Sequence, residues 1–137
     1  YQNVTFPSNG GTAHGYLAVP ESGSGPGLIV IQEWWGLTDH IADVSNRFAR
    51  EGFVVLAPDL FGGRTTHDEE EAGNLMGQLD PAKAVQELSG AVDYLLARPS
   101  TIPHPDAATS QTTAVLPANG ANYATIANWI AAGCLTP

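Results

Sequence analysis

Cysteine and basic residues are the scarcest chemical groups in this sequence of 137 residues. The single cysteine, Cys134, excludes an internal disulfide and any metal site built from several thiolates. Five Lys and Arg stand against 14 Asp and Glu, which gives a net charge of −9. Five dispersed cations cannot form a basic patch, so we expect no nucleic-acid partner. No apolar run approaches the ~18 residues of a membrane span, so we also expect no membrane partner.

Two further absences bear on cofactors and on location. The four histidines have no metal-ligand spacing such as His-x3-His, and no glycine pair belongs to a phosphate-binding motif. We therefore expect neither a metal nor a cofactor. No leader peptide precedes Tyr1, and a lone thiol is typical of a reducing compartment, so the sequence favours a cytoplasmic protein.

The composition changes near residue 98. All five basic residues lie between Arg47 and Arg98, and Asp106 is the only charged residue after Pro99. Such a shift is typical of a boundary or of a join between sequences of different origin. We expect a single domain in which residues 1–98 pack with a Pro/Ala/Thr-rich tail, residues 99–137. The proline-rich stretch 99–105 is the expected hinge, because three prolines cannot continue a helix.

Hydrophobic patterning predicts alternating strands and helices. Strands are expected at 3–6, 12–19, 27–32 and 53–57, and helices at 38–51, 68–79 and 80–98. Segment 27–32 is apolar up to its last residue, which is typical of a strand buried on both faces. The apolar stripe expected on the last helix is Val85, Leu88, Val92 and Leu95. The pattern predicts an α/β fold, with an N-terminal hairpin and then parallel strands flanked by helices.

The tail continues the alternation of strand and helix once more. Residues 112–116 resemble a strand, 117–120 a turn, and 123–132 a helix with one apolar face. The tail is therefore able to complete the sheet with one more strand and helix.

Two segments carry a resemblance to a known family. Residues 28–37 (LIVIQEWWGL) and 52–61 (GFVVLAPDLF), with a helix between them, are similar to the dienelactone hydrolase family of α/β-hydrolases. The resemblance covers about residues 1–98 and not the tail. It implies cleavage of carboxylic esters or lactones, and an order 1-2-4-3 for the first four strands.

The resemblance also implies where catalytic groups belong. A family member carries a Cys nucleophile on a sharp strand-to-helix turn, Gly-x-Cys-x-Gly, and an Asp and a His later in the chain complete the triad. A Glu at the end of the third strand interacts with that thiol, and Glu33 matches it. The backbone N–H of Trp34 matches one oxyanion donor.

The remaining family positions depart from this pattern. Neither Gly-x-Cys-x-Gly nor Gly-x-Ser-x-Gly occurs in the sequence, and residues 117–121 (PANGA) stand where the elbow is expected. Glu69 and Gly73 occupy the positions of an Arg and a Tyr that hold a substrate carboxylate. We therefore expect a fragment or hybrid without catalytic activity, in which a strand at 112–116 covers the apolar edge of strand 27–32.

Two alternatives stay open. The chain is an active ester or lactone hydrolase if Cys134 acts as nucleophile with His104 and Asp106, or if another chain supplies the missing half. It is an assembly module if an uncovered sheet edge drives a homodimer.

Two single features also have two interpretations each. Glu33 is either an active-site carboxylate or a solvated one. Trp34 and Trp35 either pack against the protein or stack on a ligand.

Overall fold

The computed structural model describes residues 1–8, 10–102 and 113–114. Its elements follow the chain as β1 (Val4–Ser8), β2 (Gly11–Ala18), β3 (Gly25–Ile29), α1 (Asp39–Arg50), β4 (Val54–Pro58), α2 (Glu69–Gln78), α3 (Pro81–Ala97), β5 (Thr101–Ile102) and β6 (Thr113–Ala114). The predicted turn at 117–120, the predicted helix at 123–132 and residues 103–105 of the predicted hinge lie outside the described residues.

The strands form one mixed sheet in the order β1-β2-β4-β3, with β5 and β6 both paired to β3. The hairpin β1–β2 and the pair β2–β4 are antiparallel, and β3 runs parallel to β4, β5 and β6. The predicted α/β fold and the order of its first four strands are confirmed. A strand from segment 112–116 also lies beside β3, where Thr113 pairs with Gly27 and Ala114 with Leu28.

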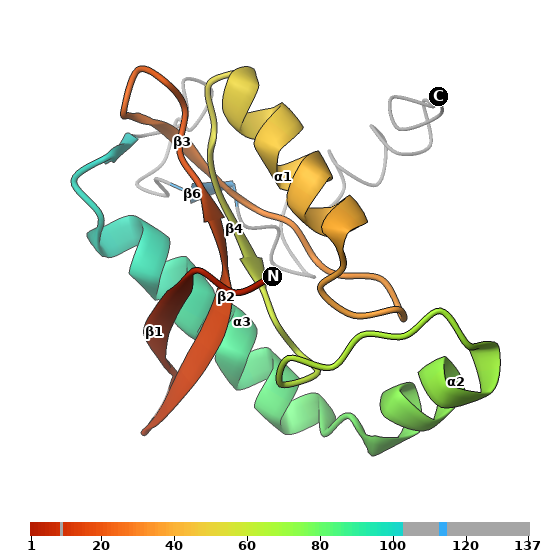
Figure 1. Ribbon diagram of the computed structural model, residues 1–137. Helices are drawn as coiled ribbons and strands as arrows, with labels where there is room; N and C mark the ends of the chain where they lie inside the picture. The colour runs from red at the N-terminus through yellow and green to blue at the C-terminus, as the bar shows by residue number, and fades with distance from the viewer. Residues whose placement is uncertain (9, 103–112, 115–137) are drawn as a thin grey trace.

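Helices α1 and α3 cover opposite faces of the sheet (Figure 1). The central strand β4 is buried along its whole length and alternates its side chains between them. Val54 and Leu56 join one cluster with Phe6, Ala91 and Leu95, on the α3 side. Val55 packs with Ala49, and Ala57 with Ile41, on the α1 side.

Strand β3 is shorter and less buried than its sequence predicts. It spans Gly25–Ile29 instead of 27–32, although Val30 N still donates to the Leu56 carbonyl oxygen at 3.0 Å. Leu28 and Ile29 are half-buried, and Ile31 is 60% exposed. After Val30 the backbone leaves the sheet for a tight turn, so apolar residues there are not strand residues. The strand is covered on both faces, since Ile29 packs on the α3 side and Leu28 on the α1 side, but neither side chain is fully buried.

The buried face of α3 also differs from the predicted stripe. The buried residues of this helix are Ala84, Gly90, Ala91 and Leu95. Val85 is 62% exposed, and of the predicted stripe only Leu95 is fully buried. At Gly90 the helix passes so close to β1 that a Cβ atom would lie 2.6 Å from the Pro7 carbonyl oxygen. Small residues, not the largest ones, therefore define the contact face.

The predicted helix starts agree with the structure. Asp68 caps α2 by accepting a hydrogen bond from Glu71 N at 2.9 Å, and Asp80 caps α3 by accepting one from Ala82 N at 2.9 Å. Thr38 precedes α1 without a side-chain cap bond. None of the helices among the described residues combines the length and the apolarity that crossing a bilayer requires.

Replacing the exposed Gly73 in α2 by alanine should stabilise the protein. A Cβ atom at this position meets no atom within 4 Å, and the residue lies inside the helix. Alanine is favoured over glycine in a helix by up to ~1 kcal/mol because it loses less backbone entropy. We expect Gly73→Ala to raise the free energy of unfolding by about 0.5–1 kcal/mol in a urea titration. An unchanged or lower urea midpoint would contradict a regular helix at this position.

Candidate functional site

The candidate site lies at the carboxyl ends of the parallel strands β3 and β4. Ligands of open α/β sheets bind at this edge. Two segments leave the sheet here: residues 33–36, which we call the β3 turn, and residues 59–68, which we call the β4 loop. Both run on the side of α2 (Figure 1).

The β3 turn is closed by its own backbone. Gly36 N donates to the Glu33 carbonyl oxygen at 3.0 Å, and Thr38 N donates to the Gly36 carbonyl oxygen at 3.0 Å. Gly36 has φ +94°, and a Cβ atom there would collide with the Arg64 carbonyl oxygen. Glycine is therefore required both for the backbone conformation and for the close approach of the β4 loop.

The two residues that the family resemblance points to, Glu33 and Trp34, both lie in this turn. The Glu33 side chain is exposed at the surface, four residues beyond the end of β3. Among the described residues, none accepts a hydrogen bond from Trp34 N. An N–H held in a rigid turn without such a partner suits an oxyanion donor. The catalytic roles of Glu33 and Trp34 stay predictions.

Two hydrogen bonds fasten the β4 loop to the segment around the β3 turn. Gln32 Oε1 accepts from Leu60 N at 2.9 Å, and the Trp35 carbonyl oxygen accepts from Thr66 N at 3.1 Å. One bond lies near the beginning of the loop and the other near its end. The loop and the turn therefore hold each other in place.

Asp59 fixes the first part of the β4 loop. This carboxylate is 5% exposed and accepts three hydrogen bonds: from Phe61 N at 3.0 Å, from Gly63 N at 2.8 Å and from Gln2 Nε2 at 2.7 Å. Its charge is thus fully engaged in shaping the loop. The sequence analysis did not assign this role, although an Asp followed by a Gly-Gly pair is a known signal for a side-chain-stabilised turn.

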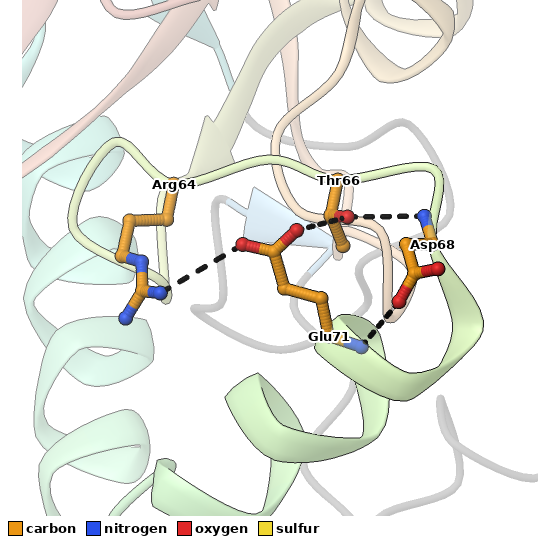
Figure 2. Close-up of polar contacts among 4 residues, drawn as sticks. All are labelled: Arg64, Thr66, Asp68 and Glu71. Carbon is orange, nitrogen blue, oxygen red and sulfur yellow. Dashed lines mark hydrogen bonds and ion pairs between the residues drawn. The ribbon is translucent and has the colours of Figure 1, made fainter.

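A second polar cluster fixes the end of the loop to α2, as Figure 2 shows. The Thr66 hydroxyl donates to Glu71 Oε2 at 2.7 Å and accepts from Asp68 N at 3.0 Å. Arg64 Nη2 lies 3.9 Å from Glu71 Oε1, and both side chains are about half exposed. Such an exposed ion pair contributes little, so Thr66 and the Asp68 cap hold the geometry.

Three aromatic rings form a row beside these contacts. The Trp34 and Trp35 ring centroids are 4.7 Å apart with an interplanar angle of 58°, and Trp35 lies 6.3 Å from the His67 ring. Trp35 is half-buried, whereas Trp34 is 40% exposed. Trp35 therefore fits the packing interpretation, and Trp34 presents part of its ring to solvent.

Of the five remaining candidates, three lie outside the described residues and two are exposed on α2. Cys134, His104 and Asp106 lie outside the described residues. Glu69 begins α2 and is exposed, as is Gly73. Within residues 1–8, 10–102 and 113–114, no three His, Cys, Asp or Glu residues come together as metal ligands.

Comparisons with known proteins agree with this architecture. The family model described as "Dienelactone hydrolase family" matches residues 13–106. Protein usf of Aquifex pyrophilus is 42% identical over 102 residues, which is 69% of this chain and 43% of that protein. The solved structure of m3DLH superposes with a TM-score of 0.59 at 30% identity, over 73% of this chain and 43% of that chain.

A further solved structure is a dienelactone hydrolase-like promiscuous phosphotriesterase, P91, from metagenomic libraries. It superposes with a TM-score of 0.59 at 28% identity, and 43% of its chain is covered. The chain belongs to the dienelactone hydrolase family, and it spans less than half the length of these relatives.

Proposed function

We propose that these 137 residues form the oxyanion side of an ester or lactone hydrolase scaffold and do not turn over such substrates by themselves. The observation that carries this proposal is a contrast at one sheet edge. Two backbone hydrogen bonds close the β3 turn, and no described residue accepts from the Trp34 N–H, yet the sequence contains neither Gly-x-Cys-x-Gly nor Gly-x-Ser-x-Gly. An oxyanion donor stabilises a transition state only after a nucleophile has attacked the carbonyl carbon.

We further propose that the tail has a structural role. Thr113 and Ala114 pair in parallel with Gly27 and Leu28, so the tail occupies the outer edge of β3. This edge would otherwise present unpaired N–H and C=O groups beside apolar side chains. The tail thus adds a strand to the sheet beside β3.

An edge-driven homodimer has less support. The outer edge of β3 is paired with β5 at Gly25 and Pro26, and with β6 at the next two residues. The opposite edge strand, β1, contains Pro7, which has no N–H to donate to another chain. Both edges are therefore poor templates for a second copy.

Assaying p-nitrophenyl acetate tests the proposed inactivity. We expect the purified chain to give no hydrolysis above a heat-denatured sample of the same protein, because the sequence contains no nucleophile elbow of the Gly-x-Cys-x-Gly or Gly-x-Ser-x-Gly kind. The matched control is Cys134→Ala, which should behave identically. Turnover by the unmodified chain that disappears in the variant would overturn the proposal and assign the reaction to Cys134.

A further inference from the structure

The ring of Trp34 is a large apolar surface left in solvent at the edge of the sheet where ligands bind. We propose that Trp34, supported by Trp35 and His67, forms an aromatic platform that binds the uncharged aryl group of an ester. Trp34 is 40% exposed, and the Trp35 ring supports it from 4.7 Å. The inference rests on the proposed function only for the ester class of the ligand.

The platform is preorganised, which lowers the entropic cost of binding. Trp34 and Trp35 occupy the middle of the β3 turn, which the Gly36-to-Glu33 hydrogen bond of 3.0 Å closes. The Trp35 carbonyl oxygen accepts a further bond from Thr66 N at 3.1 Å, so the β4 loop supports the turn. His67 follows directly in that loop, and its ring lies 6.3 Å from that of Trp35.

The charges around the platform select against anionic ligands. Glu33 precedes Trp34 and carries an exposed carboxylate, and the Glu71 carboxylate accepts a hydrogen bond at 2.7 Å from Thr66, whose N–H donates to the Trp35 carbonyl oxygen. The nearby cation, Arg64, already faces Glu71 at 3.9 Å. A ligand carboxylate would therefore meet like charge, whereas a neutral ring gains stacking area on Trp34 without that cost.

Saturation-transfer NMR with phenyl acetate tests the platform directly. We expect transfer to the ring protons and a dissociation constant of about 1–5 mM, as suits a ligand of this size. Two matched probes test the contributions of the aromatic ring and of charge separately. Cyclohexyl acetate lacks the aromatic ring, and phenoxyacetate carries a negative charge. Each should bind at least about fivefold more weakly than phenyl acetate.

Variants then locate the binding surface. Trp34→Leu should weaken phenyl acetate binding at least about fivefold, whereas Trp34→Phe, which keeps a ring, should stay within about threefold of the unmodified chain. Val85→Ala, an exposed apolar residue on α3, and Trp129→Leu in the tail should bind normally.

Three results would overturn the platform: equal binding of cyclohexyl acetate, normal binding by a folded Trp34→Leu variant, or loss of binding in Trp129→Leu. The cyclohexyl comparison needs no variant, so it stands even if Trp34→Leu does not fold. Hydrolysis of p-nitrophenyl acetate refutes the proposed function and leaves the platform intact. The two failures are therefore distinguishable.

Discussion

Gly90→Ala is expected to destabilise the protein by about 2 kcal/mol, although alanine is intrinsically the better helix residue. The added methyl group would lie 2.6 Å from the Pro7 carbonyl oxygen and 3.1 Å from Ser8 Cα. Both are backbone atoms of β1 and cannot rotate away, so α3 and β1 must separate. Separation opens the cluster that contains Phe6, Ala91 and Leu95.

The matched control for Gly90→Ala is the same substitution at Gly73. Position 73 is free of neighbours within 4 Å, so alanine should stabilise there and destabilise at 90. Urea titrations of both variants measure the sign of each change in the free energy of unfolding. For Gly90→Ala we also expect the thermal midpoint to fall by several degrees. Two shifts of the same sign would show that helix propensity, not the contact between α3 and β1, decides the outcome.

Deleting residues 107–137 should make the protein insoluble or leave it in large assemblies. The deletion removes β6 and leaves Gly27 and Leu28 paired with β4 alone, so the outer edge of β3 is open at these two residues. An apolar strand edge of this kind pairs with other chains. We expect light scattering to show a species several times the mass of the monomer, or loss of the protein to the pellet.

A smaller change tests the same pairing without removing the tail. Replacing Thr113 and Ala114 together by proline removes the N–H groups of β6 while the length of the chain stays the same. This double variant should also associate, more weakly than the deletion. A truncated chain that stays folded and monomeric at high concentration would contradict a structural role for the tail.

The sequence predicts elements well where local signals and burial agree. The hairpin around Gly10 and the helices expected at 68–79 and 80–98 follow from local chemistry, and the structure has each of them. The predictions fail where packing partners decide. Hydrophobicity alone favoured Val85 on the buried face of α3, but the absence of a side chain at Gly90 sets which face approaches β1. Hydrophobic periodicity does not show that the missing side chain at Gly90 allows α3 to approach β1 closely.

In the candidate site, too, local motifs are predictable from the sequence and long-range contacts are not. The motif around Glu33 and Trp34 is contiguous in sequence, so the resemblance locates the turn directly. The bond between Gln2 and Asp59 joins residues 57 positions apart, and nothing in either local sequence specifies the partner. The contact between Gln32 and Leu60 spans 28 positions and is equally invisible. Only the strand order of the sheet brings these groups together.

Because of the hydrogen bond from Gln2 to Asp59, formation of the site depends on the folding of segments far apart in the sequence. Gln2 is synthesised long before Asp59, so its side-chain amide has no Asp59 partner until β4 has been made and has paired with β2. Closing a loop of this length costs chain entropy that local turns do not, and contacts of high sequence separation slow folding. We therefore expect the β4 loop to reach its final shape only after β2 and β4 have paired.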